Sequence, residues 1–146
     1  MHGNFRALVW VTVLAAVGGA SWIVLGQAST DPRLWQHRNL GKAFYENPTT
    51  HGEAVAELKE ALALAPKSPR DRLNYGLALL RQGENEAGMA ELLKVQKEDP
   101  KLPHTWFNLG ILYKKENETE KAIEQFEQMV KLVPTEPVSH YQLGSL

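Results

Sequence analysis

The stretch from His104 to Pro134, HTWFNLGILYKKENETEKAIEQFEQMVKLVP, decides the fold of this chain. Large and small residues recur in it at helical spacings, in two runs separated by polar turn residues. Two antiparallel helices can approach closely only where one presents Gly or Ala, so Gly110 and Ala122 mark the expected contact. Three large residues would fill the space beside it: Trp106, Tyr113 and Phe126. The stretch therefore predicts a helix–turn–helix unit.

The same pattern recurs with a period of 34 residues. Pro66, Pro100 and Pro134 lie 34 residues apart, each near the end of a helical pattern. At the same spacing, one column holds small residues and two hold mostly larger apolar residues: Ala54, Gly88 and Ala122; Leu58, Leu92 and Phe126; Ala61, Val95 and Met129. A repeated unit of two helices is therefore expected along most of the chain.

A glycine column shows where one unit differs in length. Its members are Gly41, Gly76, Gly110 and Gly144. The first spacing is 35 residues, and the later ones are 34. Turns tolerate insertions better than packed helices do, so the extra residue is expected in the turn at 47–52.

These columns resemble the tetratricopeptide repeat (TPR) family, whose unit is a helix–turn–helix of 34 residues. The third unit matches the signature through Trp106, Leu109, Gly110, Tyr113, Ala122, Phe126 and Pro134. The other units are looser, because His37 and Arg72 stand at the tryptophan position and Leu79 at the tyrosine position. The resemblance implies an all-α solenoid of about three units plus a partial fourth, at 34–68, 69–102, 103–136 and 137–146.

Helix starts can be read from capping residues. Asp31–Pro32 and Ser68–Pro69 each combine an N-cap residue with proline in the first turn, and Thr50 with Glu53 predicts a capping box. The expected helices lie near 33–46, 51–65, 69–82, 85–98, 103–116 and 119–132.

Composition and motifs exclude several classes of function. The 146 residues carry 16 Lys and Arg against 17 Asp and Glu, which leaves no overall basic charge for nucleic acid. The absence of cysteine excludes disulfides and thiolate chemistry. The histidines show no metal-ligand spacing, and no catalytic motif occurs. We therefore expect no enzyme activity, no cofactor, no metal site and no nucleic-acid partner.

The N-terminal segment differs from the rest of the chain. No residue from Ala7 to Gly26 is charged, and about 20 apolar residues in a helix span a bilayer. A cleavable signal peptide is the alternative, since Arg6 supplies a charged start and Ala28 an acceptable cleavage site, but its apolar region is usually shorter. We therefore expect a transmembrane anchor, or an uncleaved signal, at 1–28.

The side of the membrane is left open by conflicting signals. Arg33, Arg38 and Lys42 outnumber Arg6, which favours a cytoplasmic domain. The short basic start followed by an apolar run is instead typical of export. The expectation is a single-pass protein of a bacterial inner membrane, with a slight preference for a periplasmic TPR domain.

The C-terminal residues repeat the opening of a first helix without its partner helix. Residues 137–146 place His140, Leu143 and Gly144 in their columns. Repeat arrays usually need a polar terminal cap. Either the chain is part of a longer array, which we favour, or this end pairs with another chain by self-association.

The charges separate between the two kinds of helix. The expected first helices carry eight basic and three acidic residues, and the second helices carry five basic and eleven acidic residues. In TPR arrays the first helices line a concave groove. The resemblance thus implies a groove that favours acidic partners. The equally weighted alternative is that the charges only keep each helix surface solvated.

An amide column is expected to face that groove. Asn39, Asn74 and Asn108 occupy equivalent positions, where a side-chain amide can both donate to and accept from an extended peptide backbone. The family's clamp for a C-terminal carboxylate matches less well, because Lys42 stands where asparagine is expected and Asn108 where a basic residue is. The expected groove residues are Arg38, Asn39, Arg70, Asn74, Leu77, His104, Asn108, Ile111 and Lys114.

Two functions follow from the sequence. The favoured one is a membrane-tethered adaptor that binds an extended, preferably acidic segment of a partner protein and assembles a complex. The alternative is the anchoring and targeting segment of a larger enzyme whose catalytic domain lies beyond residue 146.

Overall fold

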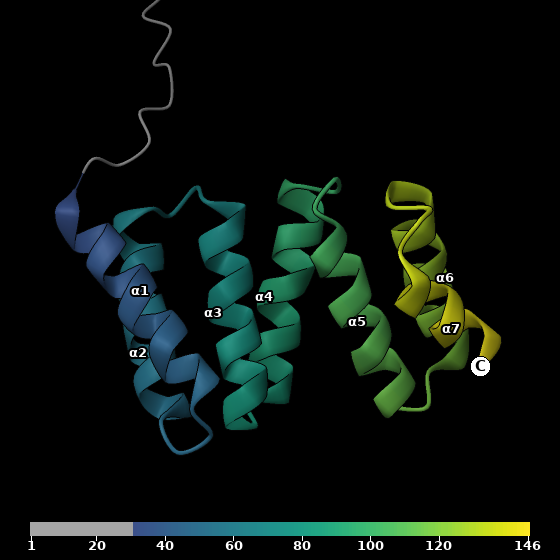
Figure 1. Ribbon diagram of the computed structural model, residues 1–146, viewed down its shortest axis with the longest axis horizontal. Helices are drawn as coiled ribbons and strands as arrows, with labels where there is room; N and C mark the ends of the chain where they lie inside the picture. The colour runs from purple at the N-terminus through teal and green to yellow at the C-terminus, as the bar shows by residue number, and fades with distance from the viewer. Residues whose placement is uncertain (1–30) are drawn as a thin grey trace, which may run out of the picture.

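The computed structural model describes residues 31–146, and these form an all-α solenoid (Figure 1). The helices are α1 (Pro32–Glu46), α2 (His51–Leu64), α3 (Pro69–Gln82), α4 (Asn85–Glu98), α5 (Pro103–Lys115), α6 (Thr119–Leu132) and α7 (Pro137–Gly144). The predicted helices are confirmed, with each end within one residue of its expected place.

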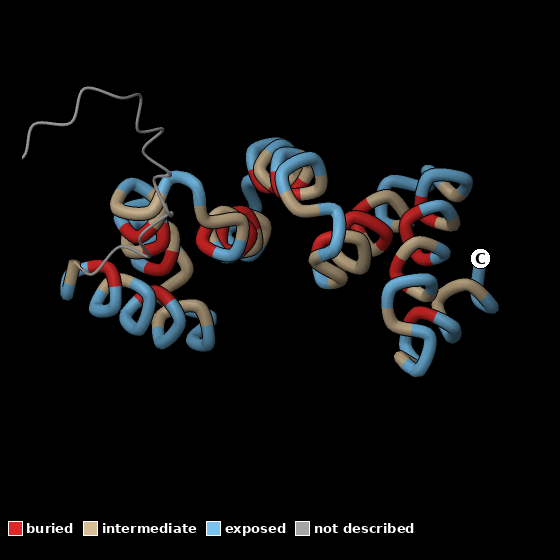
Figure 2. Tube along the Cα trace, turned by 90° about the horizontal axis from the view of Figure 1, so that it is seen from above, coloured by how far each residue is buried: buried red, intermediate tan, exposed pale blue. Residues whose placement is uncertain are grey.

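The helices pack as consecutive antiparallel pairs, with α1 against α2, α3 against α4 and α5 against α6. Figure 2 shows that the pairs follow an arc, with α1 and α7 at the ends lying to one side of α3 and α4 in the middle. The first helices of the pairs therefore line the concave face, which is the face seen in Figure 1.

The predicted membrane location has to be corrected. Among the helices of residues 31–146, none is long and apolar enough to cross a bilayer. The longest of them, α1, has 15 residues, whereas a transmembrane helix needs about 20 apolar ones. The segment on which the prediction rested, 7–26, and the expected anchor at 1–28 lie outside the described residues. We therefore withdraw the location in a bacterial membrane.

Two of the three predicted helix caps are confirmed. The Asp31 carboxylate accepts a hydrogen bond from the backbone N–H of Arg33 at 2.9 Å, and the Ser68 hydroxyl accepts one from that of Asp71 at 3.2 Å. The predicted capping box at Thr50 is wrong. Its hydroxyl instead donates to the carbonyl of Phe44 at 2.9 Å, so it serves the end of α1 rather than the start of α2.

The glycine column lies where the helices of a pair meet, as predicted, and in the third pair Gly110 faces the ring of Phe126. A Cβ added at Gly110 would lie 2.7 Å from Cε1 of Phe126, which is closer than carbon atoms can approach. In the second unit, a Cβ added at Gly88 would lie 2.9 Å from the backbone oxygen of Gly76. The missing side chains therefore allow each pair of helices to cross closely.

The turns explain the irregular spacing. The turn between α1 and α2 contains residues 47–50, whereas α3 and α4 are separated by residues 83 and 84 alone. The inserted residue therefore lies in the first turn, as predicted. Between α5 and α6, Asn117 adopts a φ of 61°, a left-handed conformation that asparagine tolerates better than most residues.

The tryptophan position keeps one contact although its residue changes. In α3, α5 and α7, the side chain at this position donates a hydrogen bond to the backbone carbonyl of the proline six residues earlier. The pairs are Arg72 Nη2 and Pro66 O at 3.0 Å, Trp106 Nε1 and Pro100 O at 2.8 Å, and His140 Nε2 and Pro134 O at 2.9 Å. The N–H donor, rather than the indole ring, is therefore what each of these helices shares in its contact with the preceding turn.

We expect Trp106→Phe to lower the free energy of unfolding by about 0.5–1.5 kcal/mol, because a smaller aromatic ring remains while the hydrogen bond to Pro100 is lost. Urea denaturation followed by circular dichroism measures the change. Trp35→Phe is the matched control, since Trp35 is 72% exposed. Equal stability of the two variants would contradict a role for the indole N–H.

Candidate functional site

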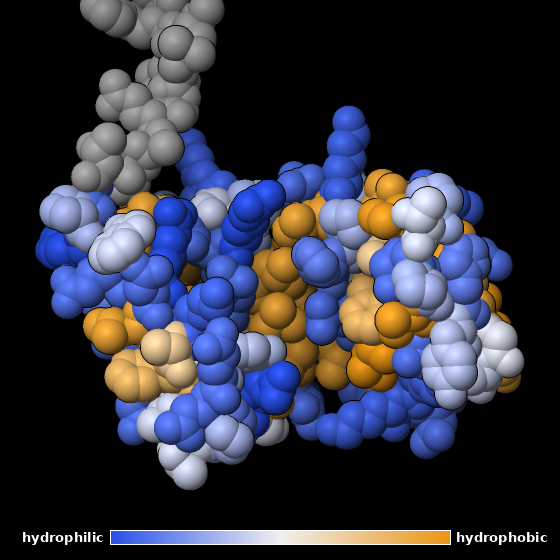
Figure 3. Space-filling view, viewed as in Figure 1, coloured by the Kyte–Doolittle hydropathy of each residue, from blue (hydrophilic) through white to orange (hydrophobic). Residues whose placement is uncertain are grey.

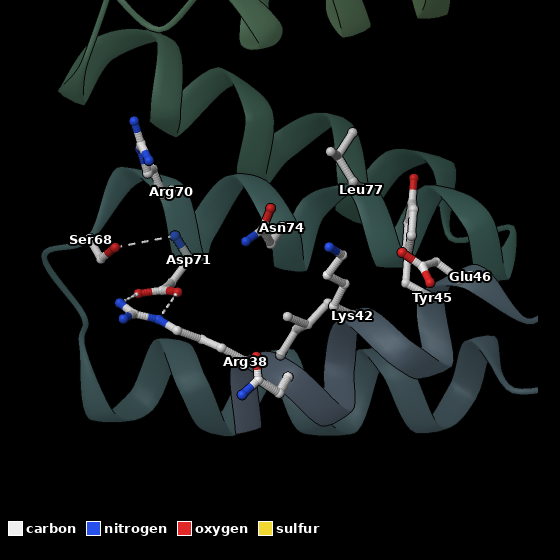
Figure 4. A pocket seen from close by; sticks show the side chains of 11 residues that line it. Arg38, Lys42, Tyr45, Glu46, Ser68, Arg70, Asp71, Asn74 and Leu77 are labelled. Atoms are coloured by element: carbon white, nitrogen blue, oxygen red, sulfur yellow. Dashed lines mark hydrogen bonds and ion pairs between the residues drawn. The ribbon is translucent and has the colours of Figure 1, made fainter. Parts of the chain in front are cut away.

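A cavity of about 580 Å³ opens between α1 and α3 on the concave face (Figure 4). We call it the α1–α3 pocket. Helix α1 contributes Arg38, Asn39, Lys42, Tyr45 and Glu46, and the α3 side contributes Ser68, Arg70, Asp71, Asn74 and Leu77, with Leu58 of α2 at the base. Polar and charged residues therefore line the pocket, but most of the surface that they expose to it is apolar.

The pocket is closed at one end by an ion pair in which only the carboxylate is buried. Arg38 Nε and Nη2 donate to the two carboxylate oxygens of Asp71 at 2.7 and 2.5 Å. Asp71 is 2% exposed, whereas the Arg38 side chain is 43% exposed. The hydrogen bonds that Arg38 donates to Asp71 raise the pKa of Arg38 above its usual value, so the guanidinium stays charged. This pair joins the first two helix pairs.

A second contact joins α1 and α3 at the other end of the pocket. The guanidinium of Arg81 lies 5.0 Å from the centre of the Tyr45 ring, and its Nε donates to the tyrosine hydroxyl at 3.2 Å. Both ends of the pocket are thus fixed before any ligand arrives. A preformed site avoids the entropy cost of ordering its walls on binding.

Four polar side chains in the pocket remain available. Within residues 31–146, Lys42 and Arg70 form no ion pair, and the amides of Asn39 and Asn74 form no hydrogen bond. Figure 4 shows Lys42 extending from α1 toward α3, and Arg70 pointing away from the Arg38–Asp71 pair. The pocket therefore offers two cations and two amides to a ligand.

The expected groove residues of α5 lie outside this pocket, and two of them are engaged elsewhere. The Asn108 amide donates to the carbonyl of His104 at 2.7 Å, one turn back in its own helix. Lys114 donates to Gln142 and Ser145 at 2.8 and 2.7 Å, and so ties α5 to the residues of α7 and its C-cap. The three asparagines therefore hold equivalent positions, but the Asn108 amide is already hydrogen-bonded within its own helix.

The concave face continues as an apolar surface beyond the pocket. Figure 3 shows hydrophobic side chains gathered over the middle of this face, between α3 and α5. Leu77 and Ile111, two of the expected groove residues, are half-buried on these helices. An extended chain that leaves the pocket toward α5 would therefore meet apolar rather than charged side chains.

The structure brings together five of the nine expected residues, Arg38, Asn39, Arg70, Asn74 and Leu77, and leaves His104, Asn108, Ile111 and Lys114 on α5. Sequence reasoning missed Lys42, Tyr45 and Asp71 as parts of one site. Asp71 carried a usable signal: it occupies a position that is buried in the following first helices, and a buried carboxylate needs a partner.

The residues described here offer no metal site. Within 31–146, no group of three or more His, Asp or Glu side chains could hold a metal ion. What the pocket offers is a preformed wall, hydrogen-bonding amides and positive charge.

Comparison with known proteins supports the fold and one repeat. Residues 103–136 match the family model described as tetratricopeptide repeat. A search of curated proteins found no match.

Solved structures with the same arrangement include MamA, with 23% identity over 79% of this chain and 67% of that one, at a TM-score of 0.69. The Sgt2 TPR domain from Aspergillus fumigatus matches with 20% identity over 78% of this chain and 76% of that one, at 0.70. The first TPR of Spaghetti (RPAP3), bound to the HSP90 peptide SRMEEVD, matches with 13% identity over 77% and 91%, at 0.71.

This chain also matches a second MamA structure, of which it covers 63%. It therefore spans about two thirds of the length of these MamA chains. Likeness at these identities extends to the fold. Residues 103–136 thus match the tetratricopeptide repeat model, and residues 31–146 have the fold of tetratricopeptide repeat proteins.

Proposed function

We propose that this domain is a protein-interaction adaptor that binds an extended segment of a partner protein on its concave face, with the α1–α3 pocket as its principal site. The observation that carries the proposal is the pair of available amides, Asn39 and Asn74, on facing walls of a preformed cavity. An RPAP3 domain of the same fold was solved with a peptide bound, which adds support by analogy.

The amides suit a peptide backbone. Each side-chain amide can donate to a peptide carbonyl and accept from a peptide N–H, as no carboxylate or ammonium group can. These contacts are independent of sequence, so they would hold any extended chain. Preference would come from Lys42 and Arg70, which attract acidic side chains, and from Leu77 and the apolar surface toward α5.

We expect Asn74→Ala to weaken peptide binding by about 5- to 150-fold, because the truncation leaves a peptide group without its partner, at a cost of about 1–3 kcal/mol. The probes are extended peptides selected on the wild-type protein from a random display library, labelled with fluorescein. Fluorescence anisotropy gives the dissociation constants.

Asn85→Ala serves as the matched control, since Asn85 is an exposed asparagine at the start of α4 and does not line the pocket. The expected result is wild-type affinity for this control. If Asn74→Ala and Asn85→Ala bind the selected peptides equally well, the pocket is not the binding surface and the proposal fails.

A further inference from the structure

The position of Asp71 in its helix shows that the fold does not require a carboxylate there. Counting five residues before each column glycine gives Gln36 in α1, Asp71 in α3, Thr105 in α5 and Ser139 in α7. Thr105 and Ser139 are completely buried at this position, as Asp71 nearly is. A small neutral side chain is therefore accommodated at the same place in two neighbouring helices.

The partner position is equally unusual. Arg38 lies three residues before Gly41, and the equivalent residues of the next two first helices are Leu73 and Phe107, which are apolar. The charged pair is thus confined to the junction that contains the α1–α3 pocket. Packing alone does not account for this choice, because the later first helices carry an apolar side chain and a hydroxyl at the two equivalent positions.

The pair changes what the pocket presents to a ligand. Its charged lining residues are Arg38, Lys42, Arg70, Glu46 and Asp71. Asp71 directs both carboxylate oxygens at Arg38 and is almost inaccessible to a ligand, whereas Arg38 remains about half exposed. A guanidinium whose charge and two donors are already used attracts a second carboxylate weakly.

We infer that Asp71 is a specificity-determining residue: it masks the charge of Arg38, so that acidic partner side chains are read by Lys42 and Arg70 alone. This inference rests on the proposed function of the groove. With Asp71 in place, the pocket carries one net positive charge; without it, the pocket carries two and gains a free guanidinium. The affinity for acidic segments is therefore lower than it would be in the same groove without Asp71.

The test compares four proteins with two probes at low salt. The proteins are the wild type, Asp71→Asn, the double variant Arg38→Gln with Asp71→Asn, and Asp99→Asn as a matched control outside the pocket. The probes are fluorescein-labelled SRMEEVD and its carboxylate-free analogue SRMQQVN with an amidated end. Fluorescence anisotropy gives the affinity of each protein for each peptide.

We expect Asp71→Asn to bind SRMEEVD about 3- to 10-fold more tightly than Asp99→Asn does, with no gain for the carboxylate-free peptide, since one partly exposed cation is released. The double variant should return to the affinity of the wild type. Asp71→Ser, which copies the buried Ser139, should repeat the gain and guards against misfolding of the first variant.

Two results would overturn the inference. One is that Asp71→Asn and Asp71→Ser bind SRMEEVD no better than Asp99→Asn, including the case in which none of them binds. The other is that the double variant gains as much as Asp71→Asn, because the gain would then not come from Arg38. The Asn74→Ala measurement tests peptide binding in the pocket separately. The proposed function can therefore be supported even if the inference about Asp71 is wrong.

Discussion

Phe126→Ala should lower the free energy of unfolding by about 3–5 kcal/mol, the usual cost of deleting a fully buried aromatic ring. The ring is 0% exposed and packs against Gly110 across the third helix pair. It also meets Phe107 edge to face, with ring centres 6.0 Å apart. Removal of the ring would leave a cavity that these helices cannot close without losing their crossing.

Urea denaturation of the purified protein measures this effect. Tyr141→Ala is the matched control, because Tyr141 is an aromatic residue of α7 that is 72% exposed. We expect it to change stability by less than about 0.5 kcal/mol. A cost below about 1 kcal/mol for Phe126→Ala would show that the third pair does not depend on this ring.

The helix pairs could be predicted because their contacts are set by residue size at fixed spacing. Gly110 and Phe126 are 16 residues apart, and steric exclusion makes the small residue necessary wherever the large one packs. The same rule gives the crossing of Gly76 and Gly88. Such contacts lie within one unit, so the sequence period exposes them directly.

Hydrogen-bond partners were harder to predict than packing. The Thr50 hydroxyl could cap α2 or bind the preceding helix, and both arrangements use the same short segment. Arg72 and His140 look like losses of the tryptophan signature, yet each keeps an N–H donor for the proline carbonyl six residues earlier. A residue signature therefore records one solution to a contact that several side chains can make.

The repeat register places residues on the concave face, but it does not give the charge that the pocket presents. Placing Arg38 and Asn74 on the concave face required only the repeat register. The state of Arg38 depends on Asp71, 33 residues away in the next unit, and neither residue has a charged counterpart in the later units. Lys114 likewise is engaged by side chains near the end of the described helices. Contacts made by residues without counterparts in the other units cannot be predicted from the sequence period.

Gly110→Leu should lower the free energy of unfolding by about 3 kcal/mol, the upper end of the usual cost of overpacking. Even its Cβ would lie 2.7 and 2.8 Å from two ring carbons of Phe126. The ring is enclosed and cannot swing away, so the helices of the third pair must separate. Thermal and urea denaturation measure the loss.

The matched control for this variant is Gly144→Leu. Gly144 holds the same repeat position in α7, but no atom lies within 4 Å of its added Cβ. We expect this control to retain wild-type stability. Equal loss in both variants would mean that the glycine column reflects helix ends or backbone freedom rather than close approach.

The double variant Gly110→Leu with Phe126→Ala tests whether the side chains at these two positions would fill the same volume. If they do, the leucine of Gly110→Leu can occupy the cavity left by Phe126→Ala. The double variant should then be more stable than the sum of the single effects by at least about 1 kcal/mol, since residues in contact are not additive. Strict additivity would place the leucine elsewhere and would remove Gly110 from the contact that sets the crossing of α5 and α6.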